Sequence, residues 1–592
     1  MKYIVSEIFI IFSFVFIVNN YIGNVEITIK SDAIGYYDYL PSIFIHHDLI
    51  RKDYTINQNE AKYKRIVETR MYNEYNGYKV NKYPCGTALL ELPFFSYTLA
   101  VMEMDHIEDD AYQFPYQKAV YYSTLFYLLL SIFFLRKLLF LYGICWPIIF
   151  FCQLCLVLGT PVTNYANFDA GFSHIYSLFA ITSFMYFSKK YFIYKMANDF
   201  IIASGLIGLI FILRQPNVII VLFLPFLSGS KDNLISTVNI LFREKKSVVI
   251  SFLSFIRIST IRLKLRRTLL IGLLLFLVVS SIQLILWYLQ TGNFFVYSYQ
   301  GEGFNFLNPQ LINILFSYRK GLYIYTPLLF VATLSVFWFA IKKDYYLLLS
   351  WCIYFFILTY FLSSWWCWYY GASYGLRAYI DFYAIFFIPF AMFLNDTNKH
   401  VRISIIVFSL LLVPLNIIQS YQYKEFILHY NNMDKDMYWK VFLKTDDTFK
   451  GLVLKKAYNM NDYKTEKEWS IGNIEIEADT IKKVFSIHSD SIQNFEKVSI
   501  VQVLIDDNYS VDEKSEVIVT IDSLERDYYK YKIPLIHFHE KLFGELQTGL
   551  YNFEYNKILN TQNMFITLEL VSSDKKKKFN NIRIKFLSKK TI

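Results

Sequence analysis

Apolar residues form long, nearly uninterrupted runs over the first 420 positions of the chain. A helix needs about 20 apolar residues to cross the hydrocarbon core of a membrane, and most of the runs approach that length. We therefore predict an α-helical polytopic membrane domain over residues 1–420, with about eleven transmembrane helices. The expected spans lie at 3–18, 116–135, 139–159, 173–188, 198–213, 217–228, 268–289, 321–341, 345–362, 378–394 and 402–418.

Two of these predictions have an alternative. The first run also fits a signal peptide, but large polar residues beginning with Asn19 follow it where a cleavage site needs small ones, so we expect an uncleaved span. The runs 198–213 and 217–228 are short and separated by the polar segment 214–216. They form either two short spans or one broken re-entrant pair.

The Lys and Arg residues orient the spans, because loops on the cytoplasmic side of a membrane are enriched in them. With the N-terminus inside, every inner connection is basic, and the longest, 229–267, carries nine Lys and Arg against two acidic residues. The outer connections are then 20–115, 160–172, 290–320 and 363–377, together with the tail from about residue 420. The high content of Ile, Lys, Asn and Tyr is typical of AT-rich bacterial genomes. We therefore expect a multi-pass protein of the bacterial cytoplasmic (inner) membrane, with a cytoplasmic N-terminus.

The C-terminal part of the chain changes its hydrophobic period. Apolar and polar residues alternate there, as in Ile474 to Glu477, a pattern typical of half-buried strands. We predict a linker at 421–439 and an extracytoplasmic all-β, sandwich-like domain at 440–592. His537 and His539 share one strand face within it and are expected to be surface residues rather than metal ligands.

Composition supports a membrane protein. Of the 592 residues, 55% are apolar and 18% are charged, whereas a soluble domain carries about 25% charged residues. This excludes a soluble cytosolic enzyme, and six scattered Cys exclude a disulfide framework. The net charge of +10 comes from the inner connections, so no nucleic-acid partner is expected.

The first outer loop contains carboxylates and a cation that suit chemistry at a membrane surface. Asp32 follows the first span directly and is a candidate catalytic base, with helix capping as the alternative. Asp38 is a weaker candidate for substrate binding, with a solvated surface residue as the alternative. Lys82, beside Pro84 and Gly86, either meets an anion near the headgroups or extends to the interface as an ordinary lysine.

Ionisable residues also lie near the next span. Asp169 and His174 are possible substrate-binding residues, because burying an ionisable group in a membrane is costly and marks functional positions. A structural role for His174 stays open. Arg214, between the two short runs, is either functional or an interfacial anchor.

Loop 290–320 contains Glu302 in a stretch rich in Tyr and Gly, which suits sugar binding. Arg319 follows near the end of this loop. Because basic residues are disfavoured at outer span ends, we interpret Arg319 as a phosphate ligand, with a residue that only marks the end of a span as the alternative.

Loop 363–377 combines an aromatic cluster with Gly371, Gly375 and Arg377. An aromatic belt explains the aromatic residues but not the glycines followed by arginine. We predict an aromatic platform beside a phosphate-binding Arg377, with pairing of Arg377 and Asp381 on one helix face as the alternative. The platform candidates are Trp365, Trp366, Trp368 and Tyr369.

These motifs resemble those of a bacterial subgroup of the GT-C superfamily. Its members are polytopic glycosyltransferases that use polyprenyl-phosphate sugars, such as protein O-mannosyltransferases and lipid A aminoarabinose transferases. The resemblance covers roughly residues 1–420. Four motifs carry it in order: Ser31-Asp32-x-x-Gly-Tyr-Tyr, Lys82-Tyr-Pro-x-Gly, Ser173-His174, and Trp365-Trp-x-Trp-Tyr-Tyr-Gly with Gly375-x-Arg377.

The resemblance implies an inverting transfer of a sugar from a polyprenyl-phosphate donor to an extracytoplasmic acceptor, which is a glycan, a lipid or a protein. Asp32 is the implied base, and Lys82, Arg319 and Arg377 are the implied ligands of the donor phosphate. Many family members have an acidic pair where this chain has Asp32 alone, so the involvement of a divalent cation stays open.

A transporter or flippase of lipid-linked glycans is the alternative function, and a polymerase of such glycans is another. A transporter needs charged residues near span midpoints. Here the charged residues gather at the outer span ends, which favours the transferase.

Overall fold

The structure is a computed structural model. It describes residues 4–23, 27–49, 71–104, 111–242, 267–446, 449, 463–478, 480–506, 516–523, 526–534, 548–554, 564–572 and 576–589. The chain divides into two compact units: unit 1 comprises Met1–Lys424 and Tyr430–Leu443, and unit 2 comprises Glu425–His429 and Lys444–Ile592.

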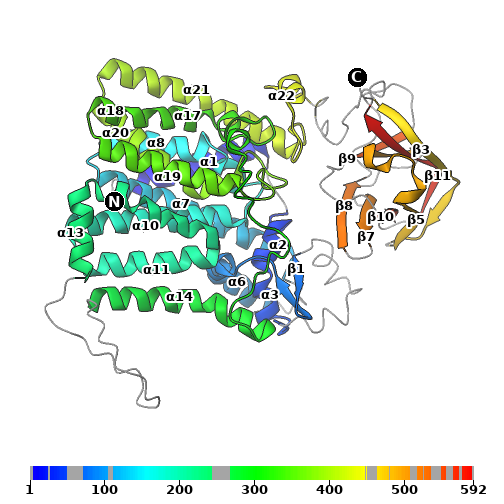
Figure 1. The fold of residues 1–592 in the computed structure, drawn as a ribbon, viewed down its shortest axis with the longest axis horizontal. Coiled ribbons are helices and arrows are strands. Elements are labelled where there is room, and N and C mark those ends of the chain that lie inside the picture. The colour runs from blue at the N-terminus through cyan, green and yellow to red at the C-terminus, as the bar shows by residue number, and fades with distance from the viewer. Residues whose placement is uncertain are drawn as a thin grey trace, which may run out of the picture. The chain divides into compact units, whose positions relative to one another are not determined.

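Unit 1 consists mainly of apolar helices that run side by side (Figure 1). Five helices among the described residues are long and apolar enough to cross a membrane. They are Ile4–Ile22 (α1, Ile4–Ile17, continued by η1, Val18–Ile22), α7 (Phe114–Phe140), α14 (Arg267–Thr291), α19 (Tyr345–Ser363) and α21 (Lys399–Lys424). The expectation of membrane-type helices is confirmed for these segments, while the full number of spans stays a prediction.

The other six expected spans contain helices that are shorter, broken or more polar. They are α8 (Trp146–Leu158), α10 (Ser173–Tyr194), α11 (Ala197–Leu213), η2 with α12 (Gln215–Phe223, Leu224–Ser228), the segment Pro327–Ile341 (α17 Pro327–Leu334, η3 Ser335–Phe337, α18 Trp338–Ile341) and α20 (Ala384–Asp396). Every expected span therefore contains a helix.

The sharpest break in this region differs from the one expected at 214–216. Segment Gln215–Ser228 bends by 118° relative to α13 (Lys231–Phe242). Gly229 lies at the bend with a φ of 80°, a conformation that glycine adopts without steric cost. The change at Arg214 is from α-helix to 3-10 helix.

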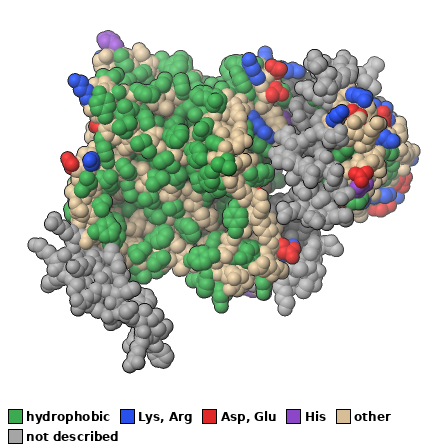
Figure 2. Space-filling view, viewed as in Figure 1, with side chains coloured by type: hydrophobic (Ala, Val, Ile, Leu, Met, Phe, Trp, Pro, Cys, Tyr) green, Lys and Arg blue, Asp and Glu red, His purple; other side chains and the backbone are tan. Residues whose placement is uncertain are grey.

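The exposed sides of the long helices are apolar. On α19, Leu349, Ile353 and Phe356 are 56%, 56% and 60% exposed, and their spacing places them on one helix face. Figure 2 shows a broad hydrophobic surface over the helices of unit 1, with the visible charged side chains near its ends. Soluble proteins rarely expose such surfaces, so these faces suit a lipid environment.

One end of the helices, which we call the basic end, carries several Lys side chains in polar contacts. Lys190 pairs with Asp199 at 2.8 Å, and Lys342 pairs with Asp396 at 2.5 Å. These lysines belong to connections that the sequence assigns to the cytoplasm. Most of the basic residues of 229–267 lie outside the described residues.

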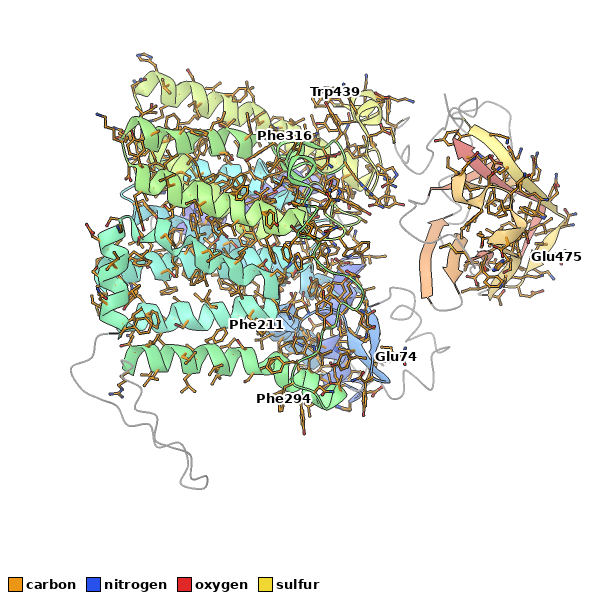
Figure 3. All side chains as sticks on the ribbon, viewed as in Figure 1. Glu74, Phe211, Phe294, Phe316, Trp439 and Glu475 are labelled. Carbon is orange, nitrogen blue, oxygen red and sulfur yellow. The ribbon has the colours of Figure 1, made fainter. Side chains whose placement is uncertain are left out.

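The opposite end, which we call the site end, carries the shorter elements. Figure 3 shows Glu74, in β1, and Trp439, in α22, at this end. Its elements are α2 (Asp32–Tyr37), α3 (Tyr39–Phe44), β1 (Tyr72–Tyr75), β2 (Tyr78–Asn81), α6 (Gly86–Met104), α9 (Val162–Tyr165), α15 (Leu311–Phe316), α16 (Leu322–Tyr325), η4 (Arg377–Phe382) and α22 (Lys435–Val441).

The segment expected as a linker, 421–439, is helical at both ends and non-helical over 425–434. It contains the end of α21 and most of α22, whose first turn is capped by Asp434 accepting from the Met437 amide at 2.8 Å. Gln419 donates to the Tyr438 hydroxyl at 2.8 Å, so α22 packs on unit 1. The capping residue and the contact with α21 account for the helix α22.

Unit 2 contains the expected β-rich region, with two antiparallel sheets. One sheet has the strand order β5-β10-β7-β8, and the other has β3-β11-β6-β9 with β4 beside β11. Residues from both sheets, such as Val519 and Ile584, join one hydrophobic core. The strands are β3 (Tyr463–Ile471), β4 (Ile474–Ile476), β5 (Thr480–His488), β6 (Val498–Asp506), β7 (Glu516–Ser523), β8 (Arg526–Pro534), β9 (Thr548–Glu554), β10 (Met564–Ser572) and β11 (Lys577–Lys589).

Candidate active site

Asp32 and Arg377 meet at the site end of unit 1. Arg377 Nη1 donates to Asp32 Oδ2 at 2.6 Å, and the Tyr83 hydroxyl donates to Asp32 Oδ1 at 2.8 Å. The Asp32 and Arg377 side chains are 20% and 16% exposed. Asp32 is the first residue of α2, and Ser31 takes the N-cap position. The hydrogen bonds of the Asp32 carboxylate go to Arg377 and Tyr83 instead of the helix backbone. The side chain thus faces the arginine and the tyrosine rather than the helix terminus.

The environment keeps Asp32 ionised. Burial raises the pKa of Asp32, but Arg377, the Tyr83 hydroxyl and Lys82 outweigh burial, so the pKa lies below its ordinary value. A carboxylate with a low pKa is fully charged at neutral pH, although it is a weak base while Arg377 holds it.

Tyr83 is held in place by a glycine of α2. A Cβ atom on Gly35 would lie 2.3 Å from Cδ2 of the Tyr83 ring, closer than any real contact. Asn81 connects the same parts, because its side-chain amide donates to the Gly35 carbonyl at 2.7 Å and its Oδ1 accepts from the Tyr83 amide at 2.9 Å. The ring of Tyr83 therefore lies directly on the backbone of α2, which fixes its hydroxyl against Asp32.

Lys82 and Glu302 form a second ion pair in the same region. Lys82 Nζ contacts Glu302 Oε1 and lies 5.0 Å from the centre of the Tyr299 ring. Trp366 Nε1 donates to the other Glu302 oxygen at 3.3 Å. These contacts bring together a cation, a carboxylate and an aromatic ring from three of the outer connections.

A third cluster surrounds Asp381. His174 Nδ1 lies 2.7 Å from Asp381 Oδ1, and the Asn217 amide donates to Asp381 Oδ2 at 2.6 Å. Arg214 Nε lies 3.6 Å from the same Oδ2. Asp381 is fully buried, whereas the Arg214 side chain is 20% exposed. Asp381 and His174 therefore fix the position of Arg214 from its buried side.

Arg214 extends the cationic site in a way that the sequence left undecided. Burial raises the pKa of the Tyr36 hydroxyl. The charges of Arg214 and Arg377 lower this pKa, and the charge of Asp32 raises it. The break between α11 and η2 positions Arg214, because its backbone is extended there and its amide still donates to Ile210 at 2.9 Å. The only sequence signal for this role was an arginine between two short apolar runs.

Arg319 has a different set of contacts from the one expected of a phosphate ligand. Its guanidinium donates to the Asn431 carbonyl at 2.9 Å and to Asn432 Oδ1 at 2.6 Å. It also stacks on Tyr369, 3.3 Å from the ring centre. Arg319 therefore connects the segment just before α22 with Tyr369 of connection 363–377.

Asp169 and Asp38 both lie among polar partners. Asp169 accepts from the Asn164 amide at 2.7 Å and lies 4.0 Å from Lys30 Nζ. Burial raises the pKa of Asp169 despite Lys30. Asp38 is fully buried and accepts from Tyr112 at 3.0 Å and from Tyr72, so it fixes the region of α2 and α3 against later parts of the same outer connection.

The tryptophans of 363–377 take two positions. Trp365 packs against Phe304 at 4.9 Å and Tyr299 at 5.9 Å between ring centres, and it pairs with Phe304 in a β-bridge. Trp368 contacts the ring of Tyr369 at 5.7 Å. The predicted platform is thus divided: Trp365 and Trp366 lie near Lys82 and Glu302, and Trp368 and Tyr369 lie near Arg319.

No group of three or more His, Cys, Asp or Glu residues suited to a metal ion occurs among the described residues. His537 and His539 lie outside them. Comparisons with protein-family models, with curated proteins and with solved structures find no match for this chain.

Proposed function

We propose that the protein is an integral membrane glycosyltransferase of the GT-C type. It moves a sugar from a polyprenyl-phosphate donor to an acceptor hydroxyl outside the cytoplasm, with Asp32 as base. The contact between Asp32 and Arg377 carries this proposal, because it unites a carboxylate and a phosphate-binding group at one end of apolar helices.

The donor phosphate binds at the Asp32–Arg377 pair. A guanidinium binds two phosphate oxygens at once, so the phosphate competes with Asp32 for Arg377. When the phosphate takes this place, Asp32 loses the cation that most lowers its pKa. The carboxylate then becomes a stronger base only when a donor is bound, while Tyr83 keeps it in position.

The transfer itself is a single displacement. Asp32 takes the proton of the acceptor hydroxyl, and the acceptor oxygen forms a bond to the anomeric carbon. The bond from that carbon to the phosphate oxygen breaks, and its electron pair stays on the phosphate. Arg377, Arg214 and Lys82 stabilise the charge that develops there, and the anomeric configuration inverts.

The neighbouring groups suit recognition of the sugar. Glu302, which Lys82 and Trp366 hold, offers a carboxylate to sugar hydroxyls. Trp366 is 49% exposed and presents a ring face of the kind that stacks on a pyranose.

The test uses membrane vesicles that contain the full-length protein and a radiolabelled polyprenyl-phosphate sugar. Asp32→Asn should reduce sugar transfer about 100-fold or more, because loss of a general base typically has an effect of that size. Glu74→Gln is the matched control, since Glu74 is exposed on β1 at the same end, and it should transfer at the wild-type rate. Transfer by Asp32→Asn within about threefold of wild type would remove Asp32 from the chemistry.

A further inference from the structure

The connection that follows α14, residues 293–316, contains a set of strongly exposed apolar side chains at the site end. Phe295 is 78% exposed, Leu307 is 99% exposed and Ile312 is 77% exposed. Glu302 is the one charged residue between positions 293 and 318, and Lys82 and Trp366 contact its carboxylate. An exposed patch of this kind marks an interaction surface.

Part of this connection is attached to the end of α19. The Asn305 amide donates to the Ser364 carbonyl at 2.6 Å, and the Gln310 amide donates to the Ser363 carbonyl at 3.0 Å. The Tyr360 hydroxyl donates to the Phe306 carbonyl at 2.6 Å. Leu307, between these anchored positions, is held in its exposed place by the fold.

The exposed side chains continue the apolar faces of two candidate membrane helices. Phe306 stacks on Tyr360 of α19 with ring centres 6.2 Å apart, and Tyr360 stacks in turn on the exposed Phe356 at 6.3 Å. At the other end of the connection, Phe294 stacks on Tyr288 of α14 at 4.5 Å. Figure 3 shows Phe294 at the end of α14.

We propose that the connection Asn293–Phe316 docks on the lipid surface, with Phe295, Leu307 and Ile312 inserted among the outer acyl chains and headgroups. Continuity with the exposed faces of α14 and α19 identifies the partner as lipid, because those faces suit the hydrocarbon core. This surface sets the depth of the neighbouring Lys82–Glu302 pair, so the site faces the headgroup region. The inference rests on the membrane location within the proposed function and needs no sugar transfer.

The experiment places an environment-sensitive NBD label at residue 307 of the full-length protein in phospholipid nanodiscs. Leu307→Cys should emit in the blue range, be quenched by nitroxide groups on lipid acyl chains and resist iodide in the buffer. Glu74→Cys, on β1 at the same end, should show the opposite response. Wild-type protein labelled in parallel corrects for native cysteines, of which Cys145 is exposed.

Iodide quenching at residue 307 equal to that at residue 74, without quenching by lipid nitroxides, overturns the proposal. Protection from both quenchers also overturns it, because it means that protein covers the surface. Ile312→Cys, on α15, repeats the test at a second position and should respond as Leu307→Cys does. Since no readout involves a sugar, an inactive protein with lipid-quenched labels would reject only the proposed transferase function.

Discussion

At the scale of single residues, four cations at the site end each face a carboxylate. This neutral arrangement means that a phosphate must compete for every cation that it binds. A buried ion pair loses much of its Coulomb gain to desolvation, so exchange of one anion for another at Arg377 is energetically feasible. The pairs are Lys30–Asp169, Lys82–Glu302, Arg214–Asp381 and Arg377–Asp32.

Substitutions at the two ends of the Arg377–Asp32 pair should change donor affinity in opposite directions. Asp32→Asn removes the competing carboxylate and should tighten binding of a polyprenyl-phosphate donor several-fold, while turnover is lost. Arg377→Ala should weaken binding at least tenfold, and Arg377→Lys should recover only part of the loss because an ammonium offers a point charge. Equilibrium binding of a fluorescent donor to purified protein measures all three.

The matched control for this series is Arg319→Ala. Arg319 is bound to Asn431 and Asn432, so this substitution should leave donor affinity close to wild type while it loosens α22. Equal weakening by Arg319→Ala and Arg377→Ala would contradict the phosphate exchange at Arg377.

Tyr83→Phe tests how Asp32 is tuned. The lost hydroxyl bond removes one of the groups that lower the pKa of Asp32, so this pKa should rise. A base must be ionised to act, and its activity is lost as pH falls through its pKa. The acidic limb of the pH profile of kcat/KM should therefore move to higher pH in Tyr83→Phe.

A control tyrosine lies at the basic end. Lys189 Nζ lies 4.3 Å from the centre of the Tyr142 ring. Tyr142→Phe should leave the pH profile unchanged. If the acidic limb of the pH profile does not move in Tyr83→Phe, the role of Tyr83 is limited to packing against Gly35.

Sequence spacing alone gave part of this site. It marked Asp32, Lys82 and Arg377 as candidates, and the structure brings Asp32 and Arg377 into contact. It also allowed an Arg377–Asp381 pair, which presumes α-helical spacing. η4 is a 3-10 helix, and Asp381 instead contacts His174 of α10, Asn217 of η2 and Arg214 between α11 and η2. Tertiary contacts of this kind leave no local pattern in a sequence.

At the scale of elements, glycine determines how closely α11 and α14 pack. A Cβ on Gly208 would lie 2.9 Å from the Val279 Cβ and 3.0 Å from the Phe276 carbonyl. Gly205 and Gly272 make similar close approaches from the two helices. Small residues let membrane helices approach in this way, and the helix they pack, α11, ends directly before Arg214.

Gly208→Ala should destabilise unit 1 by about 1–3 kcal/mol, because an added methyl group in a tightly packed seam forces the helices apart. The thermal unfolding midpoint in detergent should fall by several degrees. Gly303→Ala is the control, since no heavy atom lies within 4 Å of a Cβ built there. Equal midpoints for both variants would show that the seam tolerates the extra volume.

The sequence predicted the helices and strands better than it predicted the candidate site. Apolar runs became helices and alternating segments became strands, since periodicity reports which faces are buried. The bend at Gly229 and the helix α22 were missed, because a positive φ and a capping aspartate act over only a few residues.

At the scale of the whole molecule, the placement of lysine and arginine predicts the orientation in the membrane. A reporter fused after residue 592 should lie outside the cytoplasm, and one inserted at about residue 245 should lie inside it. Alkaline phosphatase and green fluorescent protein fusions report the two sides. Finding both reporters on one side would contradict the eleven-span topology and the outer position of Asp32.

The Arg377–Asp32 contact joins positions 345 residues apart, and this separation has a consequence for biosynthesis. At about 5–20 residues per second, a ribosome needs roughly 17–70 s to reach Arg377 after it has made Asp32. During that interval the chain contains Asp32 but not yet Arg377. A nascent or truncated chain that ends before η4 therefore contains Asp32 without Arg377. The ion pair, and with it the proposed donor site, forms only after η4 has been made.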